Sequence, residues 1–379
     1  MNILLLSCKT GGGHDAAANA LKEQFVLMGH DAFVFDYLTL ASVKTAKMVA
    51  NIYVKTVQKT PAVFGMAYNL GMTVSKHFKK SPVYLANKKM GKYLEVYLKE
   101  HHYDAIVMTH LYPAETITFM KEKGISLPPT FGVFTDYTVI PFWEETNCDY
   151  YITPHASLTE ECIKRGLNKE KLHPFGIPFS PKILVEVSKE EACLNLELDS
   201  SKKIILLIGG SMGAGSLVSM VKAFINNVQD LSNYQIVVIC GNNERVYNKI
   251  KRIVLGYKSF IILGHTSKMP LYMKAADIVY TKPGGLTSTE TFASRKPMVV
   301  TFPIPGCETA NRDFFLKENM AISGNGANEL VNNGIKLLND EVELEKMKEA
   351  QRKNVDISST SKIAEFIINE VNKTKNELN

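Results

Sequence analysis

The sequence of 379 residues contains no apolar run of about 18 residues, the length that a helix needs to cross a bilayer. Any role at a membrane is therefore expected to be peripheral. Leu4, Leu5 and Leu6 form a short apolar run near the start of the chain, and no basic segment precedes them. This pattern favours a buried strand over the apolar core of a signal peptide.

Two kinds of metal-binding or redox pattern are also missing. The six cysteines lie at positions 8, 148, 162, 193, 240 and 307 and show no metal-ligand or redox-motif spacing, so we expect buried thiols in a reducing compartment. The sequence contains no Asp-x-Asp pair, which transferases use to hold a sugar diphosphate through a divalent metal. We therefore expect no metal and no cofactor, with backbone amides and helix N-termini neutralising a diphosphate.

Short apolar runs that end in glycines or polar residues and lead into helical patterns occur in two series. This alternation predicts an α/β fold with two Rossmann-like domains that face each other across a cleft. The first domain is expected over 1–176 and the second over 203–355. A proline-containing linker is expected over 177–202, and a C-terminal helix over 356–379 that packs back on the first domain. The predicted strands are 2–7, 31–37, 105–109, 130–135, 150–153, 203–208, 235–240, 260–263, 278–280 and 298–302.

Segment 41–100 interrupts the first series. It holds eleven lysines and two acids, a net charge of +9, and aromatic residues are interleaved with the lysines. Many lysines lie three or four residues apart, so they would share helix faces. The pattern predicts an inserted group of helices that binds an anionic membrane surface, with Lys76, Lys79 and Lys80 as contacts. An ordinary solvated face remains the alternative, and no nucleic-acid motif accompanies the charge.

The first glycine loop, Gly11-Gly12-Gly13-His14, follows the first predicted strand and opens a helix. Histidine at the carboxyl end of a strand can take a proton from a hydroxyl group near neutral pH, which makes His14 the candidate general base. His110 and Asp136 follow two other predicted strands, where open α/β sheets bind ligands. Asp136 either orients His14 or acts as the base itself.

Three further loops occupy the same position in the second series. The loop that contains Gly210, Ser211, Met212 and Gly213 invites a nucleotide diphosphate, although it lacks the strict dinucleotide-binding spacing. Gly284, Gly285 and Thr287 mark a second helix start, and the carboxylate of Glu290, one turn in, can accept both hydroxyls of a ribose. Glu308 and Asn311 lie three residues apart and can hydrogen-bond sugar hydroxyls.

Together these motifs resemble the monogalactosyl- and diglucosyl-diacylglycerol synthases, glycosyltransferases similar to family 28 and related to the enzyme that adds N-acetylglucosamine to the peptidoglycan lipid precursor. The resemblance covers nearly the whole chain. It implies a GT-B fold, a lipid-acceptor site in the first domain, and inversion at the anomeric carbon. We expect Gly12 and Gly13 on the acceptor side, together with His110 from its place at a strand end, where turn-capping is the alternative role. It places the UDP-sugar in the second domain, on Gly210, Ser211, Met212, Gly213, Asn242, Gly284, Gly285, Thr287, Glu290, Glu308 and Asn311. The family often has glutamine where Cys307 stands here.

The resulting hypothesis is a metal-independent glycosyltransferase that moves glucose or galactose from a UDP-sugar to diacylglycerol or a glycosyl-diacylglycerol. It is expected in the cytoplasm, bound peripherally to the inner face of the cell membrane, with no nucleic-acid partner. Three alternatives stay open: transfer of N-acetylglucosamine to a polyprenyl-linked lipid, a UDP-sugar epimerase, and a non-catalytic sugar-nucleotide sensor at the membrane. The motifs do not separate glucose from galactose.

Overall fold

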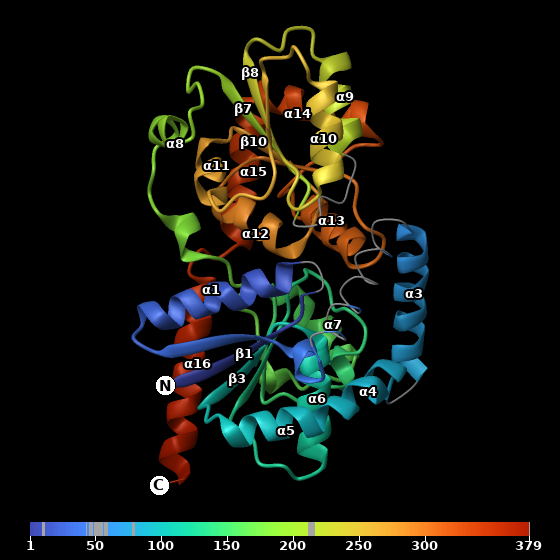
Figure 1. Cartoon of the computed structure of the whole chain (residues 1–379), viewed down its shortest axis with the longest axis vertical. Coiled ribbons are helices and arrows are strands. Elements are labelled where there is room, and N and C mark those ends of the chain that lie inside the picture. Colours follow the sequence, from blue (N-terminus) through green and yellow to red (C-terminus); the bar gives the residue numbers. More distant parts are fainter. Residues whose placement is uncertain are drawn as a thin grey trace. The chain divides into compact units, whose positions relative to one another are not determined.

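The computed structural model describes residues 1–9, 12–42, 44, 48, 56, 60–77, 80–210 and 217–378. The chain divides into two compact units (Figure 1). Unit 1 comprises Met1–Pro181 together with Ser358–Asn379, and unit 2 comprises Lys182–Ile357. The second unit is therefore inserted between the main part of the first unit and its last helix.

Unit 1 contains a parallel sheet with the strand order β2-β1-β3-β4-β5-β6. Its strands are β1 (Asn2–Ser7), β2 (Asp31–Asp36), β3 (Ala105–Met108), β4 (Thr130–Val133), β5 (Tyr150–Ile152) and β6 (Leu172–His173). Its helices include α1 (Gly13–Leu27), α3 (Pro61–His77), α4 (Pro82–Asn87), α5 (Gly91–Glu100), α6 (Leu111–Glu122), α7 (Thr159–Lys164) and α16 (Ser359–Leu378). Segment 41–100 thus carries α3, α4 and α5, and no strand among its described residues.

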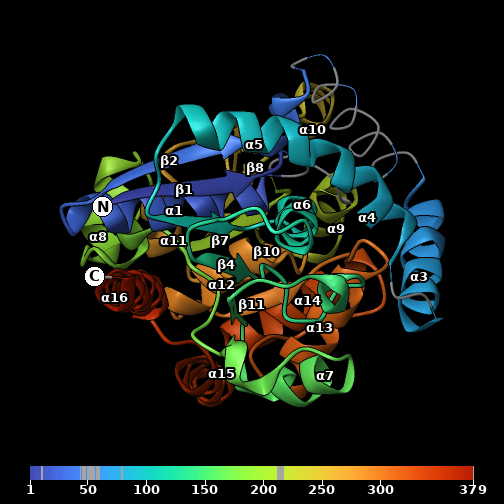
Figure 2. The same cartoon turned by 90° about the horizontal axis from the view of Figure 1, so that it is seen from below.

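Helices cover both faces of this sheet because its strands are apolar on both sides. In β1, Ile3 and Leu5 pack in one cluster with α1 and α16, and Leu4 and Leu6 pack in another with α5 and α6. Figure 2 shows α1 and α5 on opposite sides of β1 and β2. The alternation of side chains along one strand therefore fills two separate parts of the core.

The C-terminal helix α16 belongs to unit 1. Its residues Ile363, Ala364, Ile367 and Val371 are buried in the cluster that also contains α1 and β1. The hydroxyl of Thr360 accepts a hydrogen bond from Phe179 N at 3.0 Å and donates one to Phe179 O at 2.8 Å. These contacts join the end of the chain to the segment where unit 1 first ends.

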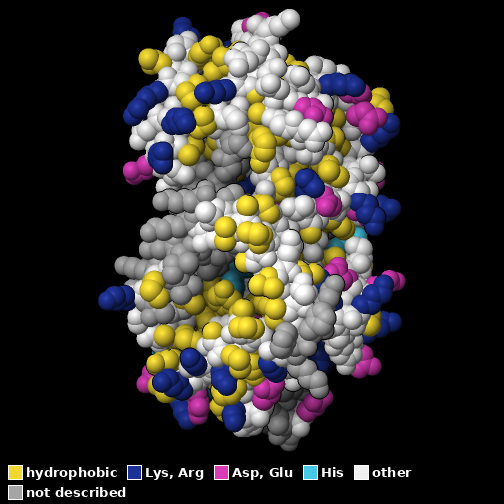
Figure 3. Space-filling view, turned by 90° about the vertical axis from the view of Figure 1, so that its right-hand side faces the viewer, with side chains coloured by type: hydrophobic (Ala, Val, Ile, Leu, Met, Phe, Trp, Pro, Cys, Tyr) yellow, Lys and Arg dark blue, Asp and Glu magenta, His cyan; other side chains and the backbone are white. Residues whose placement is uncertain are grey.

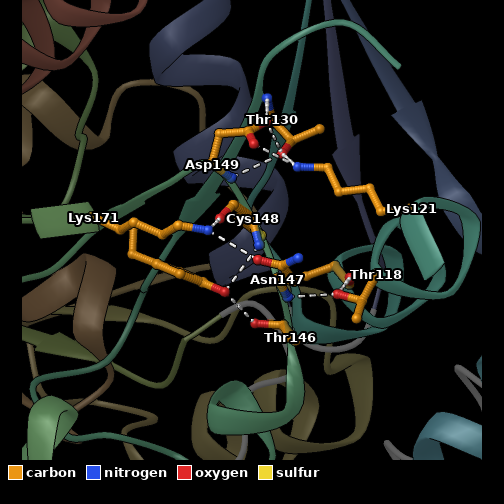
Figure 4. A network of polar contacts seen from close by, with 10 residues as sticks. Thr118, Lys121, Thr130, Thr146, Asn147, Cys148, Asp149 and Lys171 are labelled. Carbon is orange, nitrogen blue, oxygen red and sulfur yellow. Dashed lines mark hydrogen bonds and ion pairs between the residues drawn. The ribbon is translucent and has the colours of Figure 1, made fainter. Parts of the chain in front are cut away.

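A polar network fixes the amino ends of two strands in unit 1 (Figure 4). Lys121 Nζ lies 2.7 Å from Asp149 Oδ1, and Asp149 Oδ2 accepts hydrogen bonds from Thr130 N at 2.9 Å and Thr130 Oγ1 at 2.7 Å. Thr130 begins β4, and Asp149 immediately precedes β5. The network lies at the amino edge of the sheet, so the loops at the carboxyl edge are left for a ligand.

Unit 2 repeats the arrangement with a parallel sheet of order β11-β10-β7-β8-β9. Its strands are β7 (Lys203–Ile208), β8 (Tyr234–Ile239), β9 (Phe260–Leu263), β10 (Ile278–Thr281) and β11 (Met298–Val300). Its helices are α8 (Lys189–Asn195), α9 (Leu217–Asn227), α10 (Glu244–Ile253), α11 (Met269–Ala275), α12 (Gly285–Ala293), α13 (Cys307–Lys317), α14 (Ala327–Leu338) and α15 (Glu341–Asn354) within the described residues.

The prediction of two Rossmann-like α/β domains is confirmed by these two parallel sheets. Two details differ from the sequence-based expectation. The short strand β6 has no apolar run to mark it. Residues 182–202, expected as part of a linker, belong to unit 2, because Ala192 and Cys193 of α8 are buried and Lys189 Nζ pairs with Asp277 Oδ2 at 2.7 Å.

Candidate active site

The carboxyl edge of the unit 1 sheet gathers three polar side chains from three separate loops. The backbone of Gly12 has φ 85°, a left-handed conformation that favours glycine, and it turns the chain after β1 into α1. His14 lies in the first turn of that helix. His110 follows β3, and Asp136 follows β4, where its charge acts on His14. The structure therefore brings together three of the five residues that were predicted for catalysis and the acceptor side, and Gly12 and Gly13 lie directly before His14.

The hydrogen bonds of His14 fix its tautomer. Its Nδ1 lies 2.7 Å from the carbonyl oxygen of Thr109 and 3.0 Å from Thr135 Oγ1. Because a carbonyl can only accept, Nδ1 carries the proton and donates it to Thr109. Thr109 Oγ1 also donates to the backbone carbonyl of His14 at 3.0 Å, so Thr109 holds both the ring and the backbone of His14. In the neutral ring, Nε2 therefore keeps the lone pair that a general base needs.

The surroundings keep this imidazole neutral at physiological pH. Burial lowers the pKa of His14, and this effect outweighs the charge of Asp136, the Thr109 carbonyl and the charge of Asp15, which all raise it. Asp136 therefore acts mainly on the protonated form of His14, which it stabilises once a proton has been taken. This arrangement suits a base that gains a proton only during the reaction.

His110 has a second role as a helix cap. Its ring lies edge-on to that of His14, with 4.4 Å between the ring centroids. Its Nδ1 accepts a hydrogen bond from Tyr112 N at 3.1 Å, which caps the start of α6. Burial, and then the nearby His14, lower its pKa well below the usual value. His110 is therefore a neutral neighbour of His14.

In unit 2 the candidate donor residues follow four strands at one edge of the sheet. Gly210 follows β7 with φ 69°, and Ser211, Met212 and Gly213 lie outside the described residues. Asn242 is exposed after β8, and its neighbour Asn243 caps α10 by accepting from Val246 N at 3.0 Å. The donor contact expected of Asn242 stays a prediction.

Helix α12 presents a first turn with no side-chain cap. Its N-cap is Gly284, and Gly285 begins the helix. Thr287 and Glu290 are half-buried on this helix, and burial raises the pKa of Glu290 to about 7. Uncapped amides at a helix start are suited to phosphate, and a carboxylate one turn later is suited to ribose hydroxyls.

Glu308 and Asn311 join the loop after β10 to the loop after β11. Glu308 Oε1 pairs with Lys282 Nζ, and Glu308 Oε2 accepts from Ile304 N at 2.9 Å. Asn311 is fully buried and donates from Nδ2 to Pro283 O at 3.0 Å. Sequence reasoning did not select Lys282, although its position directly after a buried strand was a usable signal.

The three lysines predicted to contact a membrane differ in what the structure describes. Lys79 and the side chain of Lys76 lie outside the described residues. Lys80 is engaged within unit 1: its Nζ lies 2.8 Å from Glu122 Oε1 and 3.9 Å from the centre of the Tyr84 ring, and it donates to Glu145 O at 3.1 Å. Lys80 is therefore held by contacts within unit 1, and its predicted contact with a membrane stays a prediction.

Two other parts of segment 41–100 expose apolar side chains. Figure 3 shows many hydrophobic side chains on the side of the molecule where α3 lies in Figure 1, and on α3 Val63, Met66 and Leu70 are exposed. A second surface, here called the α4–α5 surface, consists of exposed residues at helical spacing: Leu85, Lys88, Lys89, Lys92, Tyr93 and Val96. Among the described residues, no helix is long and apolar enough to cross a bilayer.

Comparison with known proteins gives two matching family models. Residues 14–179 match the model described as monogalactosyldiacylglycerol (MGDG) synthase, and residues 204–365 match the glycosyltransferase family 28 C-terminal domain. The two models divide the chain nearly as the two structural units do, and the first begins at His14.

Similar proteins extend over almost the whole chain. A processive diacylglycerol β-glucosyltransferase of Bacillus licheniformis is 26% identical over 372 residues, which is 98% of this chain and 94% of that protein. The protein of the same name from Bacillus subtilis is 25% identical over 370 residues, covering 95% and 93%.

Two solved structures have a similar fold. MurG from Acinetobacter baumannii has a TM-score of 0.62 at 15% identity, covering 97% of this chain and 99% of that one. The UDP-GlcNAc 2-epimerase of Neisseria meningitidis, solved with UDP-GlcNAc, also has a TM-score of 0.62, at 10% identity, covering 97% and 100%. At these identities the likeness concerns the fold, which transferases and epimerases share.

Proposed function

We propose that this chain, which belongs to the monogalactosyl- and diglucosyl-diacylglycerol synthase family of GT-B glycosyltransferases, transfers a hexose from a UDP-sugar to diacylglycerol or a glycosyl-diacylglycerol. The observation that carries the proposal is the neutral His14, whose Nδ1 is fixed on the Thr109 carbonyl and whose Nε2 is left for a hydroxyl group. Diacylglycerol glucosyltransferases that are similar over nearly the full length support the lipid acceptor.

The chemistry of the proposed reaction follows from the fixed tautomer. Nε2 of His14 takes the proton of the acceptor hydroxyl while the oxygen attacks the anomeric carbon of the sugar. The bond from that carbon to the diphosphate breaks, and UDP leaves with the electron pair, so the anomeric carbon is inverted. The charge of Asp136 stabilises the imidazolium that forms. Base catalysis of this kind contributes about 10²- to 10⁴-fold to the rate.

The proposed donor site lies at the carboxyl edge of unit 2. The glycines of two loops let a backbone approach a diphosphate closely, and the first turn of α12 adds amide donors. Glu290 is placed to accept the ribose hydroxyls. The described residues contain no group of three or more His, Cys, Asp or Glu side chains suited to a metal ion. In the proposed reaction, protein amides and cations neutralise the charge of the leaving group.

The proposed location is the inner face of the cell membrane. Three exposed lysines of the α4–α5 surface lie beside Leu85, which is 47% exposed, and Val96, which is 56% exposed. Near an anionic leaflet each lysine contributes roughly 1 kcal/mol to binding, while the apolar side chains enter the lipid boundary. Reversible docking would bring the acceptor to the sheet edge that carries His14.

The donor reaction is tested by measuring UDP release from a panel of UDP-sugars with and without diacylglycerol vesicles. The proposal predicts release that depends on diacylglycerol and on one hexose donor. Release without a lipid would favour an epimerase or hydrolase. Binding of a UDP-sugar without any turnover would favour a sensor, and turnover with only a polyprenyl-linked acceptor would favour N-acetylglucosaminyl transfer.

Binding of the α4–α5 surface to an anionic membrane is tested by a separate pair of variants. Replacing Lys88, Lys89 and Lys92 by Glu should reduce sedimentation with anionic vesicles and lipid glycosylation together, while UDP binding persists. The matched control replaces Lys249, Lys251 and Lys258, three exposed lysines of unit 2, by Glu and makes the same change in net charge. Equal vesicle binding by both variants would rule out the α4–α5 surface as the membrane contact.

A further inference from the structure

Lys282 is held in a defined position at the carboxyl edge of the unit 2 sheet. It is the first residue after β10, and its side chain is 15% exposed. Its Nζ pairs with Glu308 Oε1, and Glu308 is in turn anchored through Oε2 by the amide of Ile304 at 2.9 Å. Because the carboxylate is fixed at one oxygen, the ammonium that pairs with the other oxygen is fixed as well.

Two glycines lie close to the side chain of this lysine. A Cβ atom at Gly210 would lie 3.0 Å from Lys282 Cε, so any other residue there would displace the lysine. A Cβ atom at Gly284 would lie 3.9 Å from Lys282 Nζ and 3.8 Å from Glu308 Oε1. Gly284 is also the N-cap of α12, whose first turn has no side-chain cap. The lysine ammonium therefore lies close to the N-cap of α12.

An ion pair that only stabilises the fold needs neither a carboxylate anchored by a backbone amide nor glycines beside the lysine. Burying a lysine and a glutamate together gives little net stability, because desolvation offsets their attraction. This pair lies at the sheet edge where open α/β folds bind ligands, and the lysine side chain keeps 15% of its surface exposed there. A lysine ammonium has three donors, and Glu308 occupies one of them. The geometry therefore fits a second, anionic partner.

We propose that Lys282 is the cation that binds the diphosphate of the nucleotide donor, and that Glu308 is a positioning residue that holds its ammonium beside the first turn of α12. This inference rests on the proposed function and adds a residue to its donor site. As the bond from the sugar to the diphosphate breaks, negative charge grows on the leaving oxygen. A preplaced ammonium stabilises that charge without any reorganisation at the moment of reaction.

The test compares UDP with uridine by calorimetry, because the two ligands differ in the diphosphate alone. Lys282→Met should weaken UDP binding about 10- to 100-fold, the loss expected for a charge-assisted contact, and leave uridine within about twofold. Glu308→Gln keeps the cation but loosens its position, so a smaller loss of about two- to tenfold is expected. Tighter UDP binding by Glu308→Gln would show that Glu308 competes with the diphosphate and would overturn its positioning role.

The double variant Lys282→Met with Glu308→Gln guards against a purely structural effect. It removes both charges, so it leaves no unpaired buried charge and is expected to fold. If Lys282→Met weakens UDP binding only because it leaves Glu308 buried without its partner, the double variant should bind UDP as the parent does, which would overturn the inference. Under the inference its UDP binding stays about 10- to 100-fold weak. A parent protein that fails to bind UDP would instead contradict the proposed function itself.

Discussion

Replacement of His14 by Gln tests the proposed base most directly within unit 1. Glutamine fills a similar volume and retains a group that can donate to the Thr109 carbonyl, but it cannot take a proton. The loss of base catalysis should lower kcat by about 10²- to 10⁴-fold. The donor motifs lie in the other unit, so the Kd for UDP should change by less than about twofold.

A graded control is available at the neighbouring threonine. Thr135 Oγ1 lies 3.0 Å from His14 Nδ1, a second contact beside the shorter one to Thr109. Thr135→Val removes this one neutral hydrogen bond, worth about 1 kcal/mol, so kcat should fall only about fivefold. A much larger loss of kcat in His14→Gln than in Thr135→Val separates the loss of the base from the loss of its orientation.

The pH dependence of kcat/KM gives a second test of His14 as the base. Because burial lowers the pKa of His14 from its usual value near 6.5, the acid limb of kcat/KM should lie below pH 6.5. The charge of Asp136 raises that pKa, so Asp136→Asn should move the acid limb to still lower pH. The assay is a pH–rate profile from pH 5 to 9 at lipid concentrations well below KM, where the rate reports kcat/KM. A His14→Gln variant with near-normal kcat, or an acid limb that Asp136→Asn leaves in place, would refute this reasoning.

Three further predictions follow from other parts of the structure. Burial raises the pKa of Glu290 to about 7, so UDP should bind more tightly at pH 8 than at pH 6, and a Glu290→Gln variant that keeps this pH dependence would contradict the ribose contact. Ile367→Ala in α16 should lower the free energy of unfolding by about 2–5 kcal/mol in denaturant titrations, and the half-buried Ile368→Ala should cost less. Burial and the nearby Glu145 raise the pKa of Glu115 to about 9 in the folded protein. Between the unfolded-state pKa and this value, only the unfolded chain releases the proton, so the free energy of unfolding falls as pH rises toward 9. Glu115→Gln should therefore gain stability relative to the parent from pH 5 to 9, whereas a pH-independent difference would contradict the buried proton.

Much of the fold could be predicted from the sequence because buried parallel strands are continuous apolar runs. The segments Asn2–Ser7, Lys203–Ile208 and Phe260–Leu263 were located at their observed bounds for this reason. Strand β6 was missed because two residues give no periodicity. Residues 182–202 were taken as a linker because the proline-rich start of the segment is locally irregular. Their burial against unit 2 depends on contacts with residues far along the chain, such as Lys189 with Asp277.

The candidate site could be predicted in position and less well in the roles of its side chains. Glycines and polar residues at strand ends marked His14, Asp136 and Glu290, because parallel strands deliver such residues to one edge. Spacing could not show that Glu308 pairs with Lys282, since the two lie on different loops. It also could not show that Lys80 is held by Glu122, because a cluster of lysines in sequence carries no information on acidic partners far along the chain.

The central claim is that the chain builds a glycosidic bond on diacylglycerol without a metal. The most direct measurement incubates the protein with diacylglycerol vesicles, UDP-glucose or UDP-galactose, and EDTA, and analyses the lipid by mass spectrometry and proton NMR. We expect a β-linked hexosyl-diacylglycerol, with one UDP released for each glycosidic bond. Release of UDP without a glycosylated lipid, an α-linked product, or turnover that returns only when magnesium or manganese is added would contradict the account.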